Sequence, residues 1–211
     1  MYKTYIFDLD GTLLDTLSDL AAAVNYALRT HGMPEHSIDD VRRFVGNGVR
    51  KLMERAIPDG AANPQFDETF ATFRQYYMAH SLDTTRPYEG IPEALAALKA
   101  RGCRLAVVSN KMMAATQELC QHFFPDTIEV AIGENEAEGI RKKPAPDTVF
   151  AALKALGVGK EGAVYVGDSD VDIETARNSG LPCISVLWGF RDREFLIQHG
   201  AKTFISDPGN L

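Results

Sequence analysis

The chain of 211 residues carries 22 basic and 29 acidic side chains, and its formal net charge is −7. Nucleic acid is therefore not an expected partner, because a polyanion selects proteins with concentrated positive charge. No run of eighteen apolar residues occurs and the three cysteines are scattered, so we expect a cytoplasmic protein without a membrane partner.

The first apolar run, residues 5–7, ends at two acidic residues, Asp8 and Asp10. An extended backbone places both carboxylates on one side, where a cation would relieve their repulsion. From residue 15 to residue 84 the apolar spacing is helical and no strand is convincing. We therefore expect an all-helical cap domain at 15–84, inserted into a discontinuous core domain formed by 1–14 and 85–211.

Strands and helices alternate in the remainder of the chain. Helices are expected from Ile91 to Leu98, at about 112–123, from Pro146 to Leu156 and around 173–176, and strands at 104–108, 128–132, 163–166, 183–186 and 203–205. This alternation predicts an α/β fold with a doubly wound, Rossmann-like parallel sheet.

Polar residues stand where several of these predicted strands end. Ligands of such sheets bind beyond the carboxyl ends of the strands. We therefore expect one site to contain Asp8, Asp10, Ser109, Asn110 and Asp168.

The acidic residues of this expected site suit phosphate chemistry that depends on a metal. A carboxylate nucleophile and a phosphate ester are both negative, so attack at phosphorus requires a cation to neutralise charge. Asp8 and Asp168 are hard oxygen ligands of the kind that Mg²⁺ prefers. Asp172, four residues further on, is expected in the inner or outer shell of the metal. An ordinary helix N-cap remains the alternative for Asp168.

The remaining candidate residues would bind the phosphoryl group or transfer protons. Lys143 would supply a fixed positive charge, and Ser109 and Asn110 would donate hydrogen bonds to the phosphoryl group. Asp10 would protonate the leaving oxygen and then deprotonate the water that hydrolyses an aspartyl-phosphate on Asp8. Lys111 is expected at the surface near the site.

Four segments, in this order and spacing, resemble the motifs of the haloacid dehalogenase superfamily. They are D-L-D-G-T-L-L-D at 8–15, V-V-S-N at 107–110, K-P-A-P-D at 143–147 and G-D-S-D-V-D at 167–172. The resemblance covers nearly the whole chain, including a helical cap after the first motif. It implies a Mg²⁺-dependent phosphomonoester hydrolase.

The resemblance also implies individual roles. Asp8 would be the nucleophile, Asp10 the acid/base, and Ser109 and Lys143 the phosphate binders. Asp8, the backbone carbonyl of Asp10, and Asp168 would hold magnesium.

Three further segments, 44–49, 52–56 and 188–191, are similar to phosphoglycolate phosphatases within that superfamily. Phosphoglycolate, or a similarly small phosphorylated metabolite, is therefore the expected substrate. A turn in the cap and the arginines beside it could select a substrate carboxylate, although plain exposure to solvent is the alternative for each arginine. These candidates are Gly46, Asn47, Arg43 and Arg50.

Other activities on the same motifs stay open from sequence. A phosphosugar mutase (beta-phosphoglucomutase-like) would return the phosphoryl group from Asp8 to a sugar, and a pyrophosphatase would cleave an anhydride. A non-catalytic binding protein is a more distant alternative. The sequence leaves the oligomeric state open.

Overall fold

The computed structural model describes residues 2–134 and 136–211, and no helix among them is long and apolar enough to cross a membrane. The chain divides into two compact units, Met1–Asp15 with Pro87–Leu211, and Thr16–Arg86. We call them the core unit and the helical unit. The cap boundaries expected from sequence, 15 and 84, lie within two residues of these divisions.

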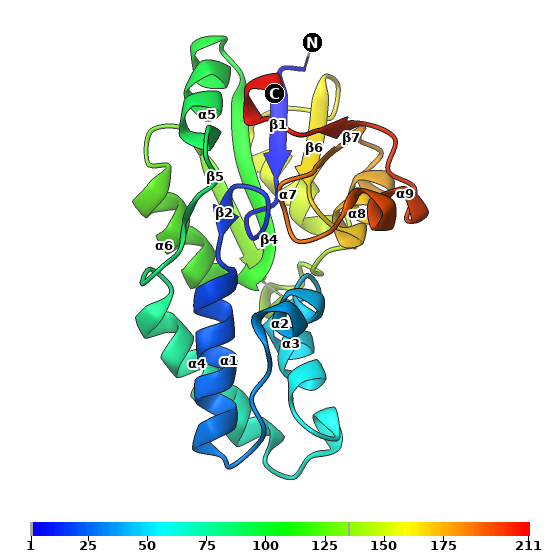
Figure 1. Cartoon of the computed structure of the whole chain (residues 1–211). Helices are drawn as coiled ribbons and strands as arrows, with labels where there is room; N and C mark the ends of the chain where they lie inside the picture. The colour runs from blue at the N-terminus through cyan, green and yellow to red at the C-terminus, as the bar shows by residue number, and fades with distance from the viewer. Residues whose placement is uncertain (1, 135) are drawn as a thin grey trace. The chain divides into compact units, whose positions relative to one another are not determined.

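The core unit is built on a six-stranded sheet in the order β5-β4-β1-β6-β7-β8. Figure 1 labels these strands except β8. Every neighbouring pair of strands runs parallel. The strands are β1 (Thr4–Phe7), β4 (Arg104–Met112), β5 (Val130–Glu134), β6 (Ala163–Gly167), β7 (Cys183–Val186) and β8 (Phe204–Ile205). This confirms the α/β fold with a doubly wound parallel sheet.

Helices pack on both faces of this sheet (Figure 1). Tyr5 and Phe7 of β1 face a cluster that includes α5 and α6, whereas Ile6 faces one that includes α7 and α8. This alternation is the two-residue period of a strand buried on both sides. The helices of the core unit are α5 (Ile91–Ala100), α6 (Met113–Phe123), α7 (Asp147–Leu156), α8 (Asp170–Ser179) and α9 (Arg193–Gln198), with short 3₁₀ turns at Glu136–Glu138 and Pro208–Asn210.

Two strands differ from the expected ranges by more than one residue. β5 begins at Val130 rather than at residue 128, because the backbone N–H of Ile128 bonds to the carbonyl of Phe124 in a turn. β4 continues past Val108 to Met112, and its register against β5 shifts between these two residues. Irregularities of this kind redirect side chains, and this one contains Ser109 and Asn110.

The helical unit consists of α1 (Leu17–Thr30), α2 (Ile38–Phe44), α3 (Val49–Ala56), a 3₁₀ turn (Gly60–Ala62) and α4 (Phe66–His80). One face of α4 is aromatic, and the rings of Phe73 and Tyr77 stack 5.8 Å apart. In addition, β2 (Leu14–Asp15) and β3 (Arg86–Pro87) form a separate two-stranded sheet.

One buried acidic residue, Asp19 of α1, holds the segment that ends the helical unit. Its carboxylate accepts hydrogen bonds from the backbone N–H groups and the hydroxyls of Thr84 and Thr85. A charged acceptor with several donors compensates for its burial.

Candidate active site

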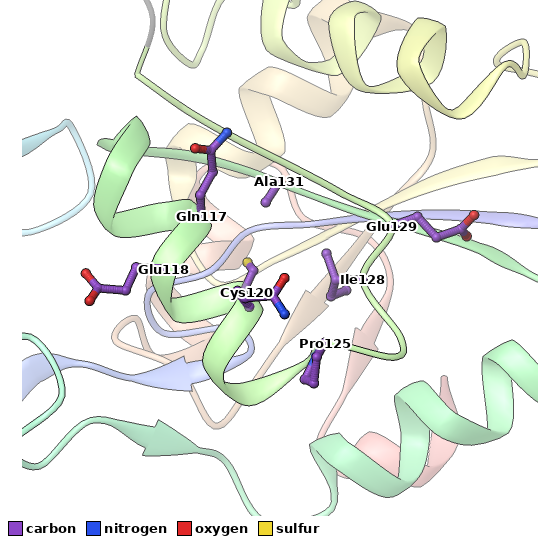
Figure 2. Close-up of a pocket in the computed structure, with 8 residues that line it drawn as sticks. Gln117, Glu118, Cys120, Pro125, Ile128, Glu129 and Ala131 are labelled. Atoms are coloured by element: carbon purple, nitrogen blue, oxygen red, sulfur yellow. The ribbon is translucent and has the colours of Figure 1, made fainter.

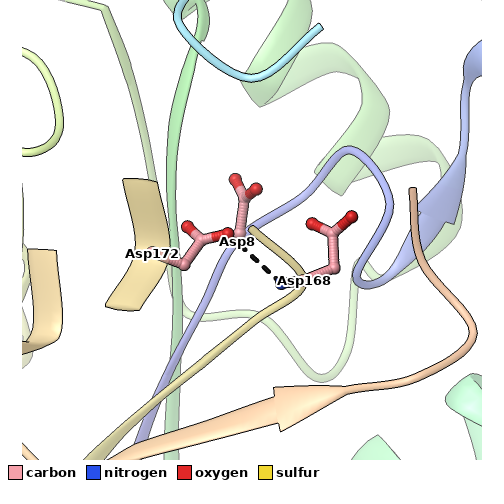
Figure 3. A group of neighbouring side chains, drawn as sticks. All are labelled: Asp8, Asp168 and Asp172. Carbon is pink, nitrogen blue, oxygen red and sulfur yellow. Dashed lines mark hydrogen bonds between the residues drawn. The ribbon is translucent and has the colours of Figure 1, made fainter. Parts of the chain in front are cut away.

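Three buried carboxylates meet where β1 and β6 end. Phe7 of β1 lies opposite Val166 of β6, so Asp8 and Asp168 follow neighbouring strands to the same edge of the sheet. Asp172 lies in the first turn of α8. One oxygen of each carboxylate lies within 4.8 Å of the others, and Figure 3 shows the three side chains together. The sequence predicted this group.

A buried lysine lies between two of these carboxylates. Lys143 Nζ is 2.8 Å from Asp8 Oδ1 and 2.8 Å from Asp172 Oδ1. It also donates to the hydroxyl of Tyr165 at 3.0 Å, and that hydroxyl donates to Asp172 Oδ1 at 2.9 Å. Burial lowers the pKa of Lys143, but Asp172 and Asp8 raise it more, so the ammonium stays charged.

Asn110 holds the backbone of this lysine. Its amide group donates to the carbonyl of Lys143 at 2.9 Å, and its amide oxygen accepts from the N–H of Lys143 at 2.8 Å. Both ends of the Asn110 side chain are therefore engaged with Lys143. In this structure the side chain positions Lys143, and its donation to a phosphate stays a prediction.

The charge balance of the site favours a further cation. Burial and Asp172 raise the pKa of Asp8 to about 7, although Lys143 opposes the change. Burial, Asp172 and Asp8 also raise the pKa of Asp168. One lysine therefore compensates the buried carboxylates incompletely, and a divalent metal would favour the ionised form of each.

Asp172 has protein partners at both of its oxygens. Oδ1 accepts from Lys143 and Tyr165. Oδ2 accepts from the N–H of Asp168 at 3.2 Å, the N–H of Ser169 at 3.1 Å and the hydroxyl of Ser169 at 2.6 Å. The sequence left open whether Asp172 binds metal directly. These contacts favour a role in orienting Lys143 and the loop before α8.

Asp168 is enclosed by two loops. Its Oδ2 accepts from the backbone N–H of Phe190 at 2.7 Å, and its Oδ1 accepts from the hydroxyl of Thr12 at 3.3 Å. A Cβ added at Gly189 would lie 2.3 Å from Asp168 Cβ, and one added at Gly11 would lie 2.4 Å from Asp168 Oδ2. Only glycine allows either loop to approach so closely.

Asp10 is paired with Lys111, for which the prediction of a surface position was wrong. Lys111 was expected at the surface, but its side chain is 1% exposed and its Nζ lies 2.8 Å from Asp10 Oδ1. Ser109, also buried, accepts from the backbone N–H of Lys111 at 3.3 Å. Both lysines of the site are thus matched to an acidic residue of the first motif.

The candidates for substrate selection lie in the helical unit. Asn47 Oδ1 accepts from Arg55, Arg50 lies 4.8 Å from the Phe66 ring centroid, and Arg43 pairs with Asp40. Gly46 and Gly48 have φ of 122° and 87°, which favour glycine. The contact of Gly46, Asn47, Arg43 and Arg50 with a substrate stays a prediction.

A separate hollow of about 480 Å³ lies beside α6 and β5 (Figure 2). Its lining includes Gln117, Cys120, Ile128 and Ala131, and none of the predicted site residues lines it. Burial raises the pKa of Cys120 to about 12, so this thiol is not a nucleophile at neutral pH.

Comparison with known proteins agrees with the four motifs. Residues 5–186 match the model of the haloacid dehalogenase-like hydrolases, and the chain belongs to that family. It is therefore a hydrolase by family, and the resemblance seen in the sequence is confirmed.

Two curated relatives are phosphatases by name. A phosphoglycolate phosphatase of Aquifex aeolicus is 36% identical over 190 residues, covering 89% of this chain and 86% of the relative. An N-acetylmuramic acid 6-phosphate phosphatase of Pseudomonas aeruginosa is 30% identical over 211 residues, covering 99% and 92%. Among solved structures, a proposed phosphoglycolate phosphatase from Lactobacillus delbrueckii subsp. bulgaricus has a TM-score of 0.94 at 38% identity, covering 99% of this chain and 96% of that one.

Proposed function

We propose that this phosphatase hydrolyses small phosphate monoesters through an aspartyl-phosphate on Asp8, with Mg²⁺ as its cofactor. The observation that carries the proposal is the gathering of Asp8, Asp168 and Asp172, two of which, Asp8 and Asp172, contact one buried lysine, Lys143. A nucleophilic carboxylate needs positive charge nearby before it can approach a phosphate. Lys143 supplies part of that charge at 2.8 Å from Asp8.

The donor set fits Mg²⁺. The group consists of carboxylate oxygens without a histidine or cysteine ligand, which is the chemistry of a hard cation rather than of zinc. Asp8, Asp168 and the backbone carbonyl of Asp10 would hold the ion. When bound, it would neutralise charge on the transferring phosphoryl group.

The protein groups then carry two successive displacements. The carboxylate of Asp8 forms a bond to phosphorus as the ester P–O bond breaks, and the protonated form of Asp10 gives its proton to the leaving oxygen and becomes the carboxylate. Asp10 next takes a proton from water, which bonds to phosphorus as the Asp8–phosphorus bond breaks and releases inorganic phosphate. Ser109 and Lys143 would bind the phosphate oxygens during both displacements.

Phosphoglycolate is the substrate we propose first, because a curated relative named phosphoglycolate phosphatase is 36% identical. Arg43 and Arg50 would contact its carboxylate. The relative that is named for N-acetylmuramic acid 6-phosphate supports sugar phosphates as the second class. A cytoplasmic location is part of the proposal, since the three cysteines Cys103, Cys120 and Cys183 are free thiols.

The test compares wild type with Asp8→Asn on a panel of phosphoglycolate, N-acetylmuramic acid 6-phosphate, a hexose 1-phosphate, p-nitrophenyl phosphate and pyrophosphate, with Mg²⁺. We expect Asp8→Asn to fold but to lose phosphate release by about a thousandfold or more. Asp170→Asn, at the first residue of α8 and without an assigned role, is the control and should stay active.

Each alternative has its own result in this assay. Ordinary activity in Asp8→Asn would contradict the covalent mechanism. Isomerised sugar phosphate in place of free phosphate would indicate a mutase, and a preference for pyrophosphate would indicate a pyrophosphatase. Inactivity of wild type on the whole panel would favour a binding protein.

A further inference from the structure

Lys111 is a buried cation that the reaction described above does not use. It lies near the end of β4, where the register against β5 shifts. Its Nζ donates to both oxygens of Asp10, at 2.8 Å and 3.1 Å. A buried ammonium is costly unless it is paired with a charge. The contact with Asp10 therefore accounts for a lysine in this position.

The backbone of Lys111 is itself fixed on several sides. Its N–H donates to Ser109 Oγ at 3.3 Å, and its carbonyl accepts from the hydroxyl of Thr116 in α6 at 3.4 Å. On the side of β5, a Cβ added at Gly133 would lie 2.7 Å from the carbonyl oxygen of Lys111. The lysine therefore extends from a rigid part of the sheet rather than from a loose loop.

Each acidic residue of the first motif has a lysine of its own. Lys143 binds Asp8, whose side chain is 11% exposed, and Lys111 binds Asp10, whose side chain is 14% exposed. In the proposed reaction Asp10 must address the leaving oxygen and later the water. A contact to both oxygens defines the plane of its carboxylate and restricts its rotation.

We propose that Lys111 is the positioning residue of the acid/base carboxylate, holding Asp10 in the orientation from which it serves the reacting oxygen. Lys111 acts through Asp10 and does not contact the substrate. The inference rests on the proposed function, because it assumes that Asp10 donates the proton to the leaving group.

A positioning role has a signature that a purely structural role lacks. Proton donation matters for an alkyl phosphate such as phosphoglycolate, because the departing alkoxide is strongly basic. It matters little for p-nitrophenyl phosphate, because the departing phenolate is stable without a proton. Misplacing Asp10 should therefore slow phosphoryl transfer from the alkyl ester selectively.

The experiment measures kcat/KM with Mg²⁺ on both esters, since this parameter reports the steps up to the first phosphoryl transfer. For Lys111→Met we expect a loss of about 10- to 100-fold on phosphoglycolate and a change within about threefold on p-nitrophenyl phosphate. Lys111→Gln, the substitute if the methionine variant does not fold, should show the same selectivity, and Lys111→Arg should recover most of the alkyl activity. Lys99→Met, which removes a core-unit lysine paired with Glu129 at 2.9 Å, is the matched control and should change neither value.

Asp10→Asn separates this inference from the function on which it rests. It should show the same leaving-group selectivity, and adding Lys111→Met to it should cost little more, because the two act as one unit. If Asp10→Asn is selective but the Lys111 variants lose both activities equally, or lose neither, only the role of Lys111 is overturned. If Asp10→Asn itself shows no selectivity, Asp10 is not the proton donor and both proposals fall.

Discussion

Replacing Lys143 by methionine tests the charge balance of the site most directly. The substitution preserves much of the length of the side chain but removes the cation that lies 2.8 Å from both Asp8 and Asp172. It also removes a donor to the hydroxyl of Tyr165. Two buried carboxylates then lose their common partner.

The size of the effect follows from the burial of the three groups. Their side chains are 2%, 11% and 0% exposed for Lys143, Asp8 and Asp172, so solvent screens the contacts weakly. Removing one partner of such a pair leaves an uncompensated buried charge and costs about 3–5 kcal/mol. In EDTA at pH 7.5 we expect the free energy of unfolding to fall by about this amount, and Mg²⁺ to recover part of it.

The pH dependence of this loss has a defined sign. The pKa of Asp8 is already raised to about 7 by burial and by Asp172, with Lys143 opposing. Without Lys143 it rises further. At pH values between the pKa of Asp8 in the unfolded chain, near 4, and its raised pKa in the folded protein, the folded protein binds more protons than the unfolded chain. Its stability therefore increases as the pH falls through this range. The deficit of Lys143→Met should therefore be smaller at pH 5.5 than at pH 7.5.

Urea denaturation followed by tryptophan fluorescence measures this change. Trp188, the one tryptophan of the sequence, belongs to the core unit and donates its indole N–H to the carbonyl of Thr12. The control is Lys142→Met, since this neighbouring side chain is 34% exposed, lies 3.6 Å from Glu136 and should contribute less than about 1 kcal/mol. A loss below about 1 kcal/mol in Lys143→Met, or a deficit that grows toward pH 5.5, would refute the reasoning.

Two further substitutions test other parts of the chain. Gly189→Ala places a methyl group 2.3 Å from Asp168 Cβ and should displace this metal ligand. The Mg²⁺ concentration for half-maximal activity should then rise by about 10- to 100-fold. An unchanged concentration would contradict the role of the Gly189 loop in positioning Asp168. Asp19→Ala leaves the donors of Thr84 and Thr85 unpaired and should destabilise the protein by about 1–3 kcal/mol at pH 7. Burial raises the pKa of Asp19, but the hydrogen bonds from Thr84 and Thr85 lower it more. Asp19 therefore contributes fully to the stability of the fold above its unfolded pKa near 4. This contribution is lost as the pH falls through the lower pKa that Asp19 has in the folded protein. Thermal unfolding of wild type and Asp19→Ala at pH 7 and pH 3 measures this, and an equal deficit at both pH values would argue against it.

The sequence was sufficient to predict the sheet and the place of the acidic group. Short apolar runs that alternate with helical spacing define a parallel sheet, and residues that follow such runs reach one edge of it. This rule predicts that Asp8, Ser109 and Asp168 lie at one edge of the sheet. The rule needs only the spacing of apolar residues, which can be read from short stretches of the sequence.

The partners of these groups were not predictable in the same way. Lys111 looks like any surface lysine, because its partner Asp10 lies 101 positions away in the sequence and no periodicity connects the two. Tyr165 stands in an apolar strand, where an aromatic residue usually signals core packing rather than a hydroxyl at a site. The donor from Phe190 is a backbone N–H, so the identity of that side chain carries no information about it.

The division of work among identical carboxylates therefore comes from their neighbours and not from the motifs themselves. Asp8 and Asp10 stand two positions apart in one segment, yet Lys143 contacts the first and Lys111 the second. Asp168 contacts neither lysine through a described ion pair and instead accepts from hydroxyl and backbone donors. A buried carboxylate with a lysine at 2.8 Å is oriented and compensated, whereas one held by hydroxyl and backbone donors gains more when a metal compensates its charge. On this reasoning Asp168 is the residue whose replacement by asparagine should weaken Mg²⁺ binding most, because no described lysine pairs with it and Arg191 lowers its pKa less than burial, Asp172 and Asp8 raise it.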